Sequence, residues 1–166
     1  MRRSSGFRTL LTTRKTYRPI LIGGLIAGAL DISYACIFSY LRSGRKPIVI
    51  LQSVASGALG RSAFDGGAKT AALGLFFHFL IALIAAAVYY FASRALRVMV
   101  TKAVLCGLIY GVLVYAFMNC VVLPLSAIPS KAFPWSYPKS VLIGGLLIHM
   151  LGIGLPIALI TRKYSK

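Results

Sequence analysis

The sequence predicts an all-α membrane protein, a bundle of four transmembrane helices. Hydrophobic residues make up 58% of the 166 residues and charged residues only 13%, whereas a soluble domain is about half apolar and a quarter charged. Four apolar runs also have the length of about 20 residues at which a helix crosses a hydrocarbon core of about 30 Å. They must be helices, because lipid leaves no partner for unpaired backbone groups. The predicted spans are residues 20–41, 71–92, 103–123 and 140–160.

The charge pattern predicts the orientation of these spans. Nineteen Lys and Arg stand against two acids, Asp31 and Asp65. Such a balance often indicates a nucleic-acid partner, but here the basic residues flank apolar runs, so we expect no nucleic acid. Most of them fall on the side that carries both ends of the chain, including basic tails at residues 1–19 and 161–166. By the positive-inside rule, both termini are predicted to be cytoplasmic.

Residues 47–60, after the first span, have the pattern of a short amphipathic helix. Ile48, Leu51 and Ala55 recur at helical spacing, whereas Gln52 and Ser56 fall on another side. Fourteen residues make about 21 Å of helix, which is too short to cross a membrane. The segment is therefore predicted to lie in the interface or to re-enter between the spans.

Two pairs of short matches indicate an internal repeat. Residues 24–30 read GLIAGAL and residues 107–113 read GLIYGVL, while residues 74–78 read GLFFH and residues 145–149 read GLLIH. The order is the same in both halves, which predicts two parallel helix hairpins related by an axis along the membrane normal. Chance is the alternative, because these residue types are common in membrane helices.

Small residues at steps of three or four predict which helix faces pack. They let helix backbones approach closely, which is how helices associate in lipid. These stripes place Asp31, His78 and His149 on seams between helices. The predicted packing residues are Gly24, Gly28, Gly74, Gly107, Gly111, Gly145 and Gly152.

Four polar residues form a predicted intramembrane cluster. Asp31 and His149 fall near the middle of their spans, and His78 and Asn119 lie further toward the outer side. A charge at mid-membrane costs about 2.5–3.5 kcal/mol on insertion scales, so it usually has a partner and a function. Asp31 beside a histidine can share a proton, which makes the cluster a candidate ligand or proton site. Alternatively, the histidines and Asn119 only hydrogen-bond the helices together.

No arrangement typical of catalysis is recognisable. Two acids and two distant histidines do not make a nucleophile–base pair or a metal cage, so no catalytic residue or metal site is predicted and an enzyme is not favoured. No cofactor is expected either. The one alternative is a b-type haem with His78 and His149 as axial ligands.

Three stretches resemble small bacterial inner-membrane proteins of unassigned function with four transmembrane helices. They are LQSVASGALG (51–60), AALGLFFHF (71–79) and MNCVVLPLSAIP (118–129). The resemblance implies a multi-pass protein of the bacterial cytoplasmic membrane. It implies no catalytic residues.

Three functions fit the sequence. An accessory or assembly subunit, which packs against other membrane proteins or against itself, is favoured by the many small residues and the short interfacial segment. A small proton-linked transporter would use Asp31, His78 and His149 and would need to dimerise. A membrane cytochrome would need both histidines to face one haem.

Overall fold

The computed structural model describes the backbone of residues 5–128 and 136–165 and the side chains of residues 17–128 and 136–165. Within these ranges the chain is helical and has no strand. Four helices are long and apolar enough to cross a membrane: Tyr17–Ser43, Gly67–Ala95, Ala103–Leu125 and Lys139–Tyr164. Each contains one of the four predicted runs, so the predicted fold class is confirmed.

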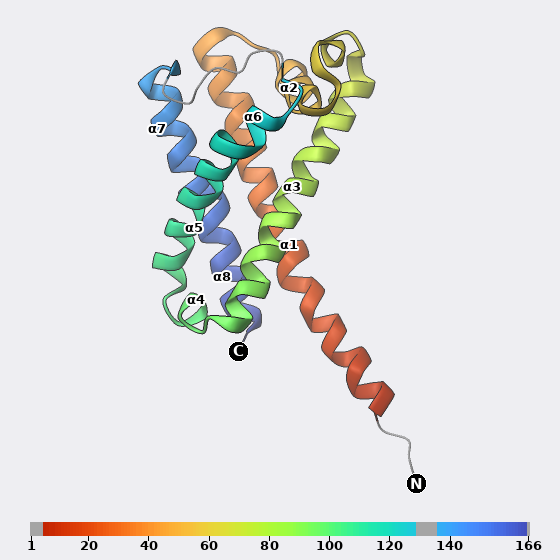
Figure 1. The fold of residues 1–166 in the computed structure, drawn as a ribbon, viewed down its shortest axis with the longest axis vertical. Coiled ribbons are helices and arrows are strands. Elements are labelled where there is room, and N and C mark those ends of the chain that lie inside the picture. The colour runs from red at the N-terminus through yellow and green to blue at the C-terminus, as the bar shows by residue number, and fades with distance from the viewer. Residues whose placement is uncertain (1–4, 129–135, 166) are drawn as a thin grey trace.

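Figure 1 shows how the helices follow one another along the chain. The first helix, α1, runs from Ser5 to Ser43, so it includes most of the segment whose charge pattern predicts a basic tail. Two π-helical segments interrupt the third and fourth spans, Met118–Val122 and His149–Gly154. The remaining elements are α2 (Pro47–Leu59), a 3-10 helix (Gly60–Phe64), α3 (Gly67–Ala95), α4 (Val98–Thr101), α5 (Ala103–Phe117), α6 (Leu123–Leu125), α7 (Lys139–Ile148) and α8 (Leu155–Tyr164).

The two ends of the bundle differ in what they carry. The N-terminal part of α1, the α4 turn and the C-terminus lie toward one end, which we call the terminal end (Figure 1). Helices α2 and α6 lie toward the other end, which we call the α2 end. Both chain ends are thus on the same side of the bundle, as an even number of spans requires.

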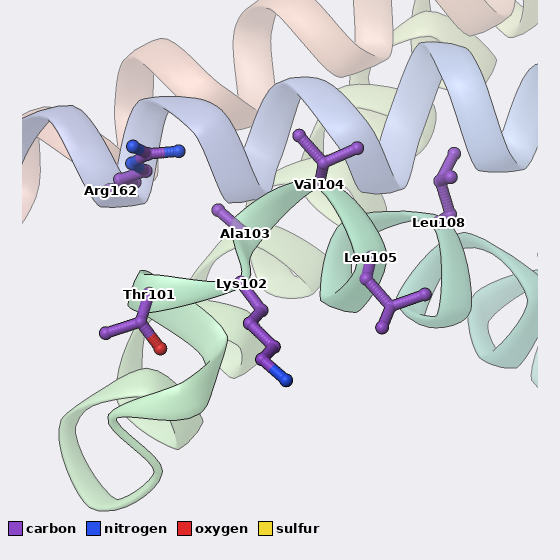
Figure 2. A pocket seen from close by; sticks show the side chains of 7 residues that line it. All are labelled: Thr101, Lys102, Ala103, Val104, Leu105, Leu108 and Arg162. Carbon is purple, nitrogen blue, oxygen red and sulfur yellow. The ribbon is translucent and has the colours of Figure 1, made fainter.

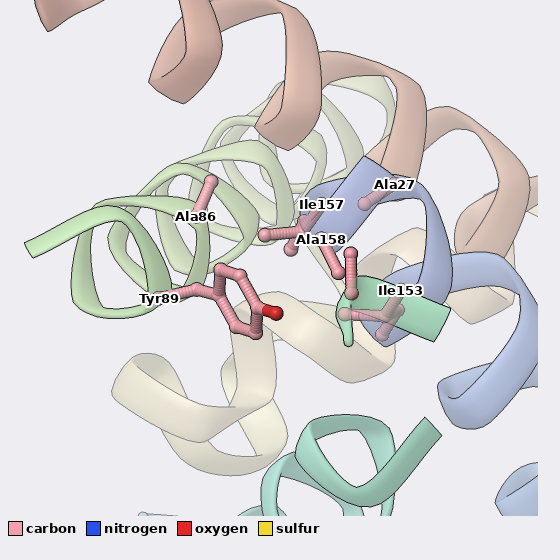
Figure 3. Close-up of a cluster of buried hydrophobic side chains, with 7 residues drawn as sticks. Ala27, Ala86, Tyr89, Ile153, Ile157 and Ala158 are labelled. Atoms are coloured by element: carbon pink, nitrogen blue, oxygen red, sulfur yellow. The ribbon is translucent and has the colours of Figure 1, made fainter. Parts of the chain in front are cut away.

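The core lies in the terminal half of the bundle and is built from small side chains around one tyrosine (Figure 3). Tyr89 is fully buried, and its hydroxyl donates a hydrogen bond of 2.9 Å to the carbonyl of Met99. Helix α8 packs closely against α1 and α5, whereas α7 makes few contacts with them. The terminal half is therefore tight, and the fourth span is held loosely in the α2 half. The core residues are Ala27, Ala86, Tyr89, Ala103, Ile153, Ile157 and Ala158.

Helix α2 is the short helix predicted after the first span, and it packs against the start of α3. A Cβ added at Gly74 would strike the backbone of Leu51, so the two helices meet at close backbone approach. The buried Gln52 amide nitrogen donates to the carbonyl of Gly67 at 3.1 Å and lies 3.4 Å from the Thr70 hydroxyl. The carbonyl of Gly57 accepts a 2.9 Å bond from the Ala127 N–H after α6. Helix α2 therefore ties α3 to the end of α6.

Replacing Gln52 by leucine is expected to loosen this connection. The variant removes the hydrogen bond from Gln52 to the carbonyl of Gly67 and leaves that carbonyl with the Thr70 hydroxyl as its side-chain donor. Losing one hydrogen bond typically costs about 0.5–1.5 kcal/mol. Hydrogen exchange measured by mass spectrometry should then rise in residues 60–70 and stay unchanged in α5. Ser53→Ala is the control, because Ser53 is exposed and bonds only within its own turn. Unchanged exchange in residues 60–70 would contradict the assigned role.

Candidate functional site

Asp31 on α1 and His149 at the end of α7 meet near the middle of their spans. The Nδ1 atom of His149 lies 3.9 Å from an Asp31 carboxylate oxygen, and the side chains are 16% and 18% exposed, respectively. The same Nδ1 lies 2.8 Å from the carbonyl oxygen of Gly145. Because a carbonyl oxygen only accepts hydrogen bonds, Nδ1 carries a proton and donates a hydrogen bond to the carbonyl of Gly145. In the neutral ring, Nε2 is then the atom that can accept a further proton.

Two tyrosines flank this pair through close approach at two glycines. The Tyr115 ring of α5 meets the His149 ring edge-on at 5.2 Å. A Cβ added at Gly145 would lie 3.0 Å from that tyrosine, and one added at Gly144 would collide with the hydroxyl of Tyr34 on α1. The bare glycine surface of α7 thus admits one aromatic residue from each neighbouring helix.

His149 is the first residue of a π-helical segment, and a proline explains the segment. Pro156 has no N–H, and a proline ring inside an α-helix collides with the carbonyl four residues earlier. The N–H of Leu155 accordingly bonds to Met150, five residues back. Segments of this kind occur frequently at functional sites.

The second π-helical segment contains Asn119 and has the same origin. Pro124 follows it, and the N–H of Leu123 bonds to Met118, five residues back. Pro124 and Pro156, near the ends of the third and fourth spans, are the sequence signal that indicates both segments.

The structure places the other two predicted polar residues elsewhere. His78 on α3 lies at the seam with α1, where its Nε2 donates to the carbonyl of Gly28 at 2.9 Å. Asn119 donates to the carbonyl of Tyr115 on its own helix at 2.8 Å. Of the four residues in the predicted cluster, Asp31 and His149 are therefore the pair that the fold brings together.

The histidine environments bear on metal and haem binding. To ligate an iron through Nε2, His78 would have to release the carbonyl of Gly28. Among residues 17–128 and 136–165, no three His, Cys, Asp or Glu side chains gather as a metal site.

The seven predicted packing glycines all lie in crowded places. An added Cβ at any of them would come within 3.0 Å of a neighbouring atom. For Gly24 and Gly28 the neighbours belong to α3, and for Gly107 and Gly111 they belong to the fourth span. For Gly152 the nearest atoms belong to Ile148 of its own span, so the crowding there is not a contact between two helices.

No family model, curated protein or solved structure matches this chain.

Proposed function

We propose that this chain is a subunit of a membrane-protein assembly, in which another protein surface covers the Asp31–His149 pair. The main support is that this ionisable pair, near the middle of two spans, is only partly covered by its own chain. The side chain of His149 is 16% exposed and that of Asp31 is 18% exposed. Lipid tails offer no hydrogen bonds, and ionisable residues inside a membrane almost always face protein or water. A partner helix would complete the cover.

The third span supports the same proposal. Only 6% of its most apolar 18-residue window is buried, against 22–28% for the other three spans. Apolar side chains on this span are as well covered by lipid as by protein, but Asn119 is not. Within the described part of the chain, its amide bonds only to its own helix. Asparagine side chains contribute to association between membrane helices when they bond across them.

The proposed setting is the bacterial cytoplasmic membrane, with both termini in the cytoplasm. It is supported by the four spans and by the excess of basic residues on the side of the termini.

A photo-crosslinking amino acid placed at Ala35 tests the proposed interface. Ala35 is partly exposed on α1 and lies one turn from Asp31 on the same face of the helix. Irradiation of cells should give an adduct of one discrete larger mass, and mass spectrometry identifies the partner or a second copy of the chain. The matched control is the same amino acid at Phe76, which is 60% exposed on α3. A chain that crosslinks only to lipid at both positions, and that has the native mass of a monomer in mild detergent, would contradict the proposal.

A proton-linked carrier is the second candidate, and one observation favours it. His149 lies where the loosely held α7 joins the tightly packed α8, in a π-helical segment with two glycines and a following proline. Glycine, proline and π-segments are the recognised causes of sharp helix bends. A bend here would change the distance between His149 and Asp31, which is the kind of coupling that a carrier needs.

We also propose that the two halves are parallel repeats. In the first half, Gly24 and Gly28 of α1 face Leu83 and Phe79; in the second half, Gly107 and Gly111 of α5 face Gly154 and Met150. The difference in residue number between Gly24 and Gly107 is the same as between Gly28 and Gly111. The difference between Leu83 and Gly154 is likewise the same as between Phe79 and Met150. These matched contacts support the sequence matches. The histidine side chains differ, because His78 bonds to α1 whereas His149 bonds within its own helix.

A further inference from the structure

The terminal end carries an open groove of about 370 Å³ between the start of α5 and the end of α8 (Figure 2). Its rim has two exposed basic residues, Lys102 in the turn between α4 and α5, and Arg162 on α8. Its wall is apolar and continues along α5 to Leu108. The groove is lined by Thr101, Lys102, Ala103, Val104, Leu105, Leu108 and Arg162.

The chain supplies no acidic side chain for these two cations. Its only acids are Asp31, in the middle of α1, and Asp65, which precedes α3 at the α2 end. Lys102 and Arg162 therefore present uncompensated positive charge toward whatever lies against the terminal end.

The groove also lies at the depth of lipid headgroups. Lys102 immediately precedes the third span, which begins at Ala103, and Arg162 lies in the last turn of the fourth. Leu108 is six residues beyond Lys102, which is about 9 Å along a helix. A molecule in this groove thus meets positive charge at the membrane surface and apolar side chains one to two turns deeper.

We propose that this groove binds an anionic phospholipid. In Figure 2 the Lys102 side chain extends away from Arg162, so it would have to turn toward α8 for both residues to hold one phosphate. The ammonium group would then act as a point charge and the guanidinium as a fork of donors. The first part of an acyl chain would lie along Val104, Leu105 and Leu108. Basic pockets between transmembrane helices bind the headgroups of anionic lipids in this way. A free phosphate would gain nothing from the apolar wall, and the wall is why a lipid is the fitting occupant.

The test is native mass spectrometry of the full chain in mild detergent, titrated with dioleoylphosphatidylglycerol. We expect one tightly retained lipid, and an apparent affinity about 30-fold lower in the Lys102→Gln/Arg162→Gln variant. This follows because each basic residue near a membrane surface contributes about fivefold to anionic-lipid binding. Dioleoylphosphatidylcholine should bind the wild type and this variant equally weakly.

A variant at the α2 end provides the matched control. Lys69 and Lys139 are exposed residues at the starts of the second and fourth spans. The Lys69→Gln/Lys139→Gln variant should have the same net charge as the test variant but keep the retained lipid, with less than about a threefold change in affinity. Equal loss in both variants would overturn the proposal, as would equal binding of the two lipids by the wild type.

Two further measurements keep the result interpretable. Leu105→Ser removes apolar wall without changing charge and should weaken binding of the anionic lipid several-fold; an unchanged affinity would contradict the acyl-chain part of the proposal. Inorganic phosphate at millimolar concentration should not displace the lipid. If it does, the groove is a phosphate site and the lipid proposal fails. Equal thermal unfolding of the two double variants shows that both are folded.

Discussion

Gly111→Ala is expected to lower the free energy of unfolding by more than about 2 kcal/mol, because overpacking a close helix contact typically costs about 1–3 kcal/mol or more. A Cβ at this position of α5 would meet the carbonyl of His149 and the Cα of Met150. Both obstacles are backbone, so no side chain can rotate away. The fourth span must move away from α5, and the close contact between these two spans is lost. Reversible unfolding in mixed detergent micelles measures the change.

Two other helical glycines make this prediction specific. At Gly23 an added Cβ would meet Ile157 at 3.6 Å, which is ordinary contact, so Gly23→Ala should be neutral or stabilise by up to about 1 kcal/mol. At Gly28, the counterpart of Gly111 in the proposed repeat, the obstacle is the Phe79 ring at 2.8 Å, which can turn. The free energy of unfolding of Gly28→Ala should lie between those of Gly111→Ala and Gly23→Ala. Equal stability of all three variants would show that the close approach at Gly111 does not hold the bundle.

The spans and the short helix after the first span were predictable because both depend on local properties. Span positions follow from the length of each apolar run, and the helix from Pro47 to Leu59 follows from apolar residues at helical spacing bounded by Lys46 and Gly60. None of these features depends on which helix neighbours which.

The pairing of Asp31 was not predictable, because it depends on helix order and rotation. Depth alone makes either histidine a suitable partner. His78 is bonded to the carbonyl of Gly28, one turn away from Asp31 on the same helix. The π-helical segment after Ile148 sets the position of His149, and a strictly α-helical reading of the fourth span does not include it.

Asp31→Asn is expected to reduce the adduct formed from position 35 by about tenfold or more, since removing one member of a buried charged pair at an interface typically costs about 2–5 kcal/mol. Asparagine keeps the shape of the side chain and removes its charge. The isolated chain should lose less than about 1 kcal/mol of stability, because the 3.9 Å contact is partly exposed and longer than a hydrogen bond. Crosslinking yield and unfolding measured on the same preparation separate the two effects.

The matched control is His78→Gln, which changes a seam histidine that bonds to backbone and not to Asp31. It should leave the crosslink unchanged, whereas His149→Gln should reduce it. The double variant Asp31→Asn/His149→Gln should lose no more of the crosslinking yield than Asp31→Asn alone, because contacting residues act as one unit in a double-mutant cycle. Full additivity would mean that the two side chains act separately.

Proton flux into liposomes that carry a pH-sensitive dye then distinguishes the two candidate functions. A carrier conducts protons without a partner and loses that flux with Asp31→Asn. A subunit shows no flux above protein-free liposomes, yet loses its crosslink with the same change. If Asp31→Asn alters neither readout, the pair serves only to hold α1 against the fourth span, and the exposed remainder of both side chains needs no protein cover. The charge of Asp31 is decisive because it is the one acidic side chain within the four spans.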